Sequence, residues 1–377
     1  MMTAAVEFDS EAITHNRRSY GEPAMRCAAT ASAIVILLML AALLVVLFAA
    51  AVPSMRRFGM EFLTTSAWRP NSLPVLKMDA RGKPIRDRRT GMKVVDHYDP
   101  PRFGALAPVT GTAQTALIAL IFAVPLSLGS ALFLVRIAPL WLIMPVSFLI
   151  EFLAAIPSIA YGLWGMFVLG PWMGGPARWD RVAGLVPMPA GIESRLSGFF
   201  MRISGLHWLA EQQIGGKTVP IPTTGRDILV AGIVLGIMII PIITAISRDV
   251  LRSVPPAQIE GTIALGATWW QSCREMLKYS RSALFGAIIL GFARASGETM
   301  AVLMVMGSAA TIAASPFTAG TTMASTLAGE FPEAATNDLH RGALMELALI
   351  LLIMSLAFNI IARYLVVGKS ARTSAAH

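Results

Sequence analysis

Long apolar runs alternate with polar segments along the chain, and the first run begins at Cys27. No charged residue occurs from Cys27 to Val52, and about 20 apolar residues are enough to cross a bilayer as a helix. A signal peptide has a shorter apolar core of about 7–15 residues. We therefore interpret residues 27–53 as an uncleaved signal anchor that forms the first membrane helix, after a polar tail over residues 1–26.

Five further runs have the length and apolar character of membrane helices, which gives six predicted spans. Prolines occur inside several of them, including Pro125, Pro157 and Pro241. Membrane helices tolerate proline because neighbouring helices satisfy the freed carbonyl groups, so each run is predicted as one span that can kink. The five runs are Ala113–Val135, Pro145–Leu169, Ile228–Ile246, Ser282–Met306 and Leu344–Val367.

With six spans, the long polar connections 54–112 and 170–227 fall on one side of the membrane. Both termini and the polar link 247–281 fall on the other side. Lys and Arg are equally numerous in the connection after the first helix and on the whole opposite side. Connections that approach about 60 residues are translocated largely regardless of charge. The charge pattern therefore does not decide which side is cytoplasmic.

The composition excludes a soluble enzyme and a disordered chain. The 377 residues are 55% hydrophobic and 14% charged, whereas soluble domains have about 45–50% apolar and 25% charged residues. The two cysteines, Cys27 and Cys273, are far apart and form no CxxC or Cys/His spacing, so neither a disulfide framework nor a zinc site is predicted. The net charge of +9 is not arranged in basic runs interleaved with aromatic residues, so we attribute it to membrane-flanking positions rather than to nucleic-acid binding.

Sequence motifs of hydrolases and nucleotide-binding sites are missing: neither HExxH, GxSxG nor a complete GxxxxGK[ST] occurs. Gly368-Lys369-Ser370 resembles the end of a phosphate-binding loop, but Arg363 stands where the first glycine belongs. The histidines are scattered, and we interpret His207 and His340 as loop residues rather than ligands. We predict no catalytic and no metal-binding residue.

The fifth run contains two charged residues, Arg294 and Glu298. Arg294 lies about 18 Å along a helix from Ser282, near the middle of the bilayer, where a charge costs at least ~3 kcal/mol on insertion scales. Glu298 follows four residues later and would share a helix face with Arg294, so the two can pair. The pair either locks helix packing or forms part of the polar lining of a translocation path.

Two more carboxylates, Glu151 and Glu346, lie inside apolar runs. Carboxylates accept a hydrogen bond from protonated phosphate but repel sulfate, which has no proton to offer. An arginine matches the oxyanion oxygens with two parallel hydrogen bonds. We therefore hypothesise a path for an oxyanion that keeps a proton, although Glu151 and Glu346 could equally be neutral or capped structural groups. The predicted path residues are Arg294, Glu298, Thr299, Glu151 and Glu346.

The polar link 247–281 is long enough for two short helices lying across the membrane surface. It contains Pro255-Pro256 and then the segment Glu260–Gly266. Without further information this segment is interpreted as an ordinary interfacial helix.

The same segment resembles the cytoplasmic loop of ABC importer permeases, whose pattern is E-A-A-x-x-x-G followed after nine residues by I-x-L-P. Glu260 and Gly266 match the first part, Gly261 and Thr262 replace the two alanines, and Met276-Leu277-Lys278-Tyr279 stands in place of the I-x-L-P end. The residues that the resemblance assigns to contact with an ATPase are Glu260, Gly261, Thr262, Ala264 and Gly266.

The fifth apolar run indicates which family of importer permeases the chain resembles. Residues 294–302 resemble the R-A-x-G-E-T-M-A-V stretch of the C-type permease of the phosphate-specific transport (Pst) system, and residues 151–162 and 343–347 are similar to that family too. The resemblance covers residues 31–70 and 104–367 and leaves 71–100 as an insertion.

This resemblance implies an all-α polytopic membrane protein with six helices and the MetI-like core of binding-protein-dependent ABC importer permeases over residues 113–367. It implies a bacterial cytoplasmic (inner) membrane location, with residues 1–26 and 368–377 as cytoplasmic tails, the loop 54–112 outside and 247–281 as the coupling loop. The implied partners are the A-type permease, two copies of an ATP-binding subunit that holds ATP-Mg, an external phosphate-binding protein and membrane lipid. No cofactor is expected in this chain.

Three other functions stay open. A permease for another oxyanion would keep the architecture. An ATP-independent secondary transporter or channel would predict inverted repeats, and none is visible in the sequence. A membrane-embedded enzyme is disfavoured because the chain has no catalytic constellation.

Overall fold

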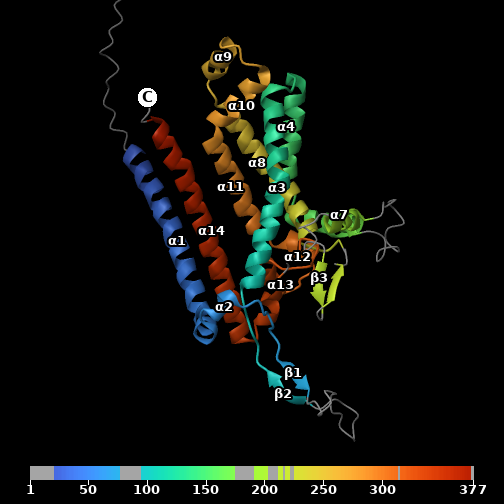
Figure 1. The fold of residues 1–377 in the computed structure, drawn as a ribbon. Helices are drawn as coiled ribbons and strands as arrows, with labels where there is room; N and C mark the ends of the chain where they lie inside the picture. The colour runs from blue at the N-terminus through green and yellow to red at the C-terminus, as the bar shows by residue number, and fades with distance from the viewer. Residues whose placement is uncertain are drawn as a thin grey trace, which may run out of the picture. The chain divides into compact units, whose positions relative to one another are not determined.

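The computed structural model describes residues 21–76, 95–174, 191–202, 211–214, 217–220, 225–312 and 315–374 (Figure 1). The chain divides into two compact units, residues 1–49 and 50–377. Most of the predicted N-terminal tail and residues 77–94 of the predicted insertion lie outside the described residues, as does His207.

Four helices are long and apolar enough to cross a membrane, and they confirm the first, second, fourth and sixth predicted spans. They extend beyond the predicted ends because polar residues at the membrane surface continue the helical hydrogen bonding. The helices are α1 (Gly21–Phe58), α3 (Leu106–Arg136), α8 (Ile228–Arg252) and α14 (Asp338–Ser374).

The third predicted span is not one helix, because the chain bends by 90° between Ala155 and Ser158. Ile156 takes an extended conformation, as the residue before a proline prefers, and Pro157 has no N–H to continue the helix. The carbonyl of Leu153, which Pro157 leaves without its helical donor, accepts a hydrogen bond of 2.8 Å from the Tyr161 hydroxyl. The pieces are α4 (Leu140–Ala155), α5 (Ser158–Trp164), the π-helix η1 (Gly165–Leu169) and α6 (Gly170–Gly174).

The fifth predicted span is also broken, with a bend of 62° between α11 (Arg281–Ser296) and α12 (Met300–Met306). The break falls at Gly297, a residue with poor helix propensity. Helix α11 packs against α8, α14 and α3, whereas α12 packs mainly against α5 and α8. The predicted number of six spans holds when each bent pair is counted as one span.

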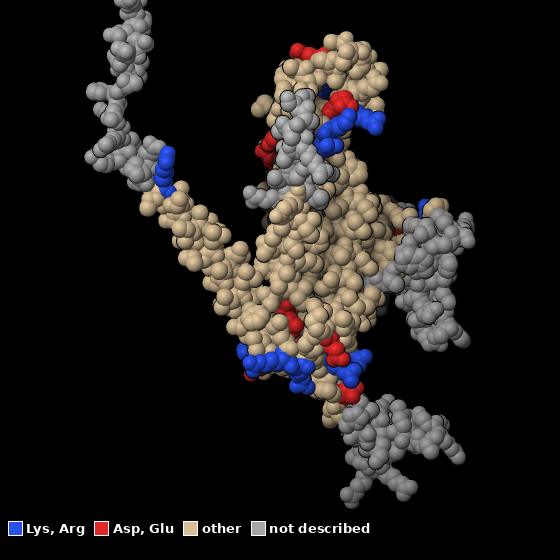
Figure 2. All heavy atoms as spheres, turned by 60° about the vertical axis from the view of Figure 1, so that its left-hand side comes forward, with Lys and Arg blue, Asp and Glu red and all other residues tan. Residues whose placement is uncertain are grey.

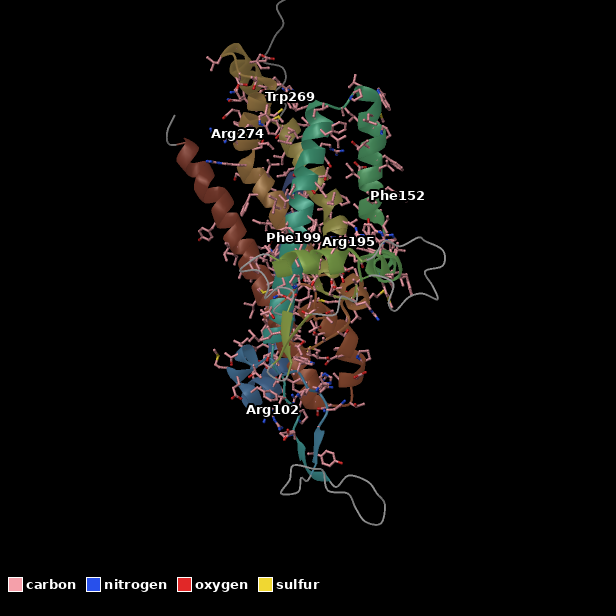
Figure 3. The ribbon with its side chains drawn as sticks, turned by 45° about the vertical axis from the view of Figure 1, so that its right-hand side comes forward. Arg102, Phe152, Arg195, Phe199, Trp269 and Arg274 are labelled. Carbon is pink, nitrogen blue, oxygen red and sulfur yellow. The ribbon has the colours of Figure 1, made fainter. Side chains whose placement is uncertain are left out.

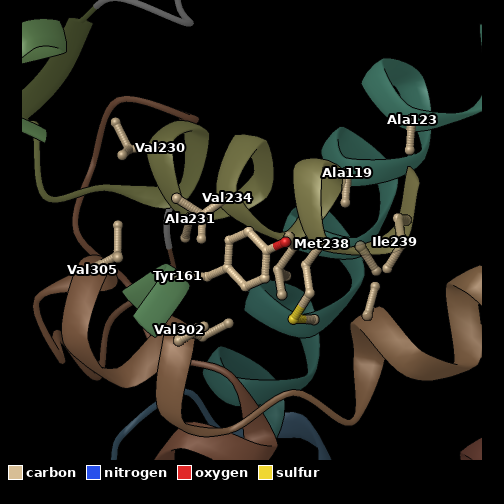
Figure 4. Packing of buried hydrophobic residues seen from close by; sticks show 14 of the residues in the cluster. Ala119, Ala123, Tyr161, Val230, Ala231, Val234, Met238, Ile239, Val302 and Val305 are labelled. Carbon is tan, nitrogen blue, oxygen red and sulfur yellow. The ribbon is translucent and has the colours of Figure 1, made fainter. Parts of the chain in front are cut away.

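The main hydrophobic core lies between α8, α3, α5 and α12. Helices α3 and α8 approach closely because Gly232 and Gly236 of α8 face α3, where a Cβ at Gly232 would collide with Ile118. Figure 4 shows the ring of Tyr161 among buried aliphatic side chains of α8 and α12. This packing fixes the bent pieces of the third and fifth spans against a straight helix.

The link 247–281 forms two short helices, α9 (Pro256–Ala264) and α10 (Trp269–Tyr279), as predicted. In Figure 1, α9 lies at one end of the unit formed by residues 50–377, and the strands β1 and β2 lie at the other. The remaining elements are α2 (Glu61–Thr64), β1 (Leu73–Leu76), β2 (Val95–Asp99), α7 (Ile192–Arg202), β3 (Glu211–Ile214), β4 (Lys217–Pro220) and α13 (Met323–Ala334).

Both small sheets are antiparallel pairs, β1 with β2 and β3 with β4. Pro74 stands opposite Tyr98 in the first pair. The two ends of the predicted insertion 71–100 are therefore joined to each other by backbone hydrogen bonds.

Candidate functional site

The break between α11 and α12 borders a shallow, mostly apolar cavity of about 440 Å³. Thr299 is the residue of the predicted path that lines it, and its carbonyl accepts the hydrogen bond from Leu303 N that starts α12. The other walls come from α13 and α14. The lining residues are Gly297, Thr299, Met300, Ala324, Leu327, Ala328, Phe331, Pro332 and Leu351.

Arg294 and Glu298 flank the break instead of sharing one face of a continuous helix. Arg294 is in the last turn of α11 and is exposed, and Glu298 follows the end of that helix and is half-buried. Among the residues that the structure describes, no ion pair joins them. The predicted pairing on one helix face is therefore wrong, because the helix ends at Ser296.

Glu151 contacts a cation that the sequence pattern did not identify. Its carboxylate Oε1 lies 3.8 Å from Nη2 of Arg248, near the end of α8. The Arg248 side chain is only 12% exposed, and its Nε also donates to Asp249 Oδ1 at 3.1 Å. The ion pair connects α4 to α8. Arg248 looks like a membrane-flanking charge in the sequence, so only the packing of the two helices reveals its partner.

Glu346 lies in a third place, on α14. It is 5% exposed, and its carboxyl group lies beside the Ser54 hydroxyl at the end of α1. The five predicted path residues thus fall into three groups: the break after α11, the α4–α8 contact and the α1–α14 contact. Their joint role as a path stays a prediction.

The predicted ATPase-contacting residues lie on α9 and in the turn after it, and α9 buries none of its residues. Gly266 has a φ of +81°, a left-handed conformation that glycine adopts without strain. Leu265, next to it, is 90% exposed. The turn presents an apolar side chain to solvent at the α9 end of the unit formed by residues 50–377.

Helix α10 fixes α9 to the membrane helices. Thr262 of α9 donates to Ser272 of α10 at 3.4 Å, and a capping box between Thr268 and Gln271 starts α10. The buried side chains of Cys273 and Met276 pack in a cluster with residues from the ends of α3, α8 and α11. Helix α10 continues to Tyr279, with Ser280 alone between it and α11.

Two carboxyl groups that sequence reasoning missed are completely buried together. Glu193 of α7 and Asp227 at the start of α8 have no exposed surface, and the two carboxyl groups are neighbours that alter each other's pKa. Asp227 also caps α8 by accepting from Val230 N at 2.9 Å, and Glu193 accepts from Gly225 N at 3.1 Å. Burial and the neighbouring Asp227 raise the pKa of Glu193 to about 9. Burial raises the pKa of Asp227 to about 6.

His340 is not a loop residue as predicted. It lies in α14, buried, with Nε2 at 2.9 Å from Glu330 Oε2 of α13. The same oxygen accepts a hydrogen bond of 2.7 Å from Trp68 Nε1. The described residues contain no group of three or more His, Cys, Asp or Glu side chains that could hold a metal ion.

Solved structures with a similar arrangement include an inward-facing MetNI methionine ABC transporter, with a TM-score of 0.42 over 69% of this chain and 93% of that chain. A second is a bacterial ABC transporter that imports the acidic polysaccharide alginate, with a TM-score of 0.43 over 68% of this chain and 78% of that chain. Each is 16% identical to this chain. No family model matches the sequence.

Curated relatives are much closer in sequence. The phosphate transport system permease protein PstC of Mesorhizobium japonicum is 34% identical over 87% of this chain and 84% of its own length. PstC of Haemophilus influenzae is 40% identical over 72% of this chain and 78% of its own length. PstC of Xylella fastidiosa is 40% identical over 71% of this chain and 75% of its own length. By this shared sequence the chain belongs to the PstC family of phosphate transport system permease proteins.

Proposed function

We propose that this chain is a transmembrane permease subunit of an ATP-driven importer of inorganic phosphate. The observation that carries the proposal is the sequence identity of 34–40% with several PstC permeases over most of the chain. The bent fifth span supports it, because the stretch that resembles the Pst permease forms the break beside a cavity.

The break supplies the groups that an oxyanion path needs. Membrane transporters place substrate sites where a spanning helix is interrupted, because the backbone there is free to line a cavity. Thr299 lines the cavity, and Arg294 and Glu298 lie on either side of the break. Arg294 can donate hydrogen bonds to phosphate oxygens, and Glu298 can accept a hydrogen bond from the O–H of a protonated phosphate. Glu151 and Glu346 contact Arg248 and Ser54, so we expect weaker effects from them.

Helix α9 would couple transport to ATP hydrolysis on a partner subunit. An exposed helix docks in a groove of its partner through one face, and α9 is exposed except at Ile259 and Thr262, which are half-buried on the side towards α10. Because α10 is anchored between the ends of α3, α8 and α11, a displacement of α9 would move three membrane helices together. Such a rigid-body movement would open the path alternately to the two sides.

The remaining partners follow from the same proposal. The chain would pair with an A-type permease, two ATP-binding subunits that hold ATP-Mg and an external phosphate-binding protein in the bacterial cytoplasmic membrane. The α9 end and both termini would be cytoplasmic, and the β1–β2 end would be external. Helix α9 and the β1–β2 pair lie at opposite ends of the unit formed by residues 50–377, as the proposal requires (Figure 1). ATP hydrolysis would occur on the partner, and this chain would contribute no catalytic residue.

ATP-dependent uptake of labelled phosphate and sulfate into vesicles with the reconstituted complex tests the proposal. Arg294→Ala should abolish phosphate uptake without preventing assembly of the complex. Arg195→Ala is the matched control, because Arg195 is an exposed arginine on α7 (Figure 3). Normal phosphate uptake by the assembled Arg294→Ala complex would make Arg294 a structural residue. Uptake of sulfate in place of phosphate would contradict the substrate and favour a permease for another oxyanion.

A further inference from the structure

Two arginines far apart in the sequence are held side by side by the backbone. Arg69 and Arg102 form an antiparallel bridge in which each residue donates to the other, at 2.7 and 3.1 Å. Residues directly opposite in such a bridge project their side chains from the same face, with Cβ atoms about 5.5 Å apart. Both arginines are exposed. Figure 3 places Arg102 at the end of the molecule opposite Trp269.

The residues next to these arginines fix the bridge to the protein. Side chains alternate in direction along extended chain, and Trp68 and Phe103 point inwards, with 6% and 2% exposure and ring centroids 5.2 Å apart. Trp68 Nε1 donates to Glu330, and Phe103 stacks on His340 at 5.3 Å. The backbone beneath the two arginines is therefore anchored to α13 and α14, so the guanidinium groups start from fixed positions.

The two positive charges have no described partner. Among the described carboxylates, none forms an ion pair with Arg69 or Arg102. Arg341, which is also exposed, differs in this respect because it donates to Asp338 at 2.7 Å. Like charges directly opposite each other in a β pair destabilise it. A bound anion would remove this repulsion.

Two further arginines lie on a segment that packs beside Arg102. Arg56 and Arg57 end α1 and are exposed. The Phe58 ring, one residue later, packs 5.9 Å from the Phe103 ring beside Arg102. Figure 2 shows Lys and Arg side chains gathered at one end of the unit formed by residues 50–377, with Asp and Glu side chains beside them.

We propose that Arg69 and Arg102 form a binding site for a phosphate-type oxyanion. Each guanidinium can donate two parallel N–H groups to oxygens of one tetrahedral anion, which a lysine could not do. The site involves none of the residues of the α11–α12 break, so it stands whether or not this chain transports phosphate. The anion is either free inorganic phosphate or the phosphodiester of an anionic lipid headgroup.

Equilibrium binding of labelled inorganic phosphate to the full chain in nanodiscs of neutral phosphatidylcholine tests whether the site binds the free anion. The Arg294→Ala background removes the contribution of the proposed path. In it, R69Q and R102Q should each weaken binding about 10-fold, since each removes one charge-assisted contact, and the double variant should abolish it. R69K/R102K keeps the charge but loses the paired N–H geometry and should also weaken binding. Arg341→Gln is the control and should bind as before, because Arg341 is already paired with Asp338.

A second arm tests the lipid source by measuring phosphatidylglycerol that co-purifies with the chain from vesicles of equal phosphatidylglycerol and phosphatidylcholine. Loss of phosphate binding in the double variant identifies the free anion, and loss of phosphatidylglycerol enrichment identifies the headgroup. Either result supports the site. If the double variant unfolds at the same temperature as the parent and neither quantity changes, the site is refuted. Lysine variants that bind as well as the parent would also refute it, since a diffuse positive field would then suffice.

Discussion

The buried pair of Glu193 and Asp227 predicts that α7 loosens from α8 as the pH rises. The two carboxyl groups are neighbours shielded from water, and a proton on one of them avoids burying two negative charges together. Above the pKa of Glu193, both groups would be negative in an apolar environment, and the contact would open. Replacing Glu193 by glutamine keeps the shape and supplies a permanent N–H donor.

The size of the effect follows from proton linkage. Glu193 has a pKa of about 9 when α7 is docked, against an ordinary value of 4.5. Because the pKa of Glu193 is raised in the docked state, that state holds a proton that the open state releases. The stabilisation of the docked state by this proton is therefore fully present below pH 4.5 and is lost progressively up to about pH 9. The slope is about 1.4 kcal/mol per pH unit. Asp227, with a pKa of about 6, changes its charge at lower pH. From pH 6.5 to 8 the docking free energy should therefore fall by about 2 kcal/mol, or roughly 30-fold in the opening equilibrium.

Hydrogen exchange of the backbone amides in residues 192–202, corrected for the intrinsic pH dependence of exchange, measures this opening. The protection of α7 in the parent should decrease roughly 30-fold from pH 6.5 to 8, and in Glu193→Gln it should stay constant. Glu333→Gln, which alters an exposed carboxylate on α13, should show the slope of the parent. Protection that is independent of pH in the parent, or that falls equally in Glu193→Gln, would refute the shared proton.

Two further predictions concern stability and coupling. Glu330→Ala leaves the buried Trp68 N–H without its acceptor, so it should lower the free energy of unfolding by about 2–3 kcal/mol. Denaturant unfolding in detergent measures this, with Glu333→Ala as the exposed control on the same helix, and an unchanged midpoint would contradict the proposed anchor. Gly266→Ala forces a side chain into a left-handed conformation at a cost of about 1 kcal/mol, so it should reduce ATP-dependent uptake by the complex. Gly286→Ala, where a Cβ meets nothing within 4 Å, should leave uptake unchanged, and equal uptake by both variants would exclude a role for the α9 turn.

The sequence by itself determined the four straight spans and the two short helices α9 and α10. These elements depend on local properties: the length of an apolar run fixes whether a helix can cross the bilayer, and a polar link between Arg252 and Arg281 leaves room for surface helices. The stretch from Arg294 to Val302 was also sufficient to indicate the family, because its spacing is a property of the chain alone.

Only the tertiary structure decided where spans break. Pro125 and Pro157 give the same local signal, yet α3 continues through Pro125, whereas the chain turns at Pro157. The difference depends on which neighbours satisfy the freed carbonyl and how the following segment packs. At Pro157 the hydroxyl of Tyr161 donates a hydrogen bond to the carbonyl of Leu153 in place of the missing N–H, and the bent segment packs against α12.

Tertiary structure also decided which charges meet. Arg294 and Glu298 are close in sequence but separated by the end of a helix. Glu193 and Asp227 come from different elements and are buried as neighbours, and Glu151 and Arg248 from different helices form an ion pair. A charge contact depends on distances in space, which a single sequence does not contain, so the ionic network could be determined only after the helices were packed.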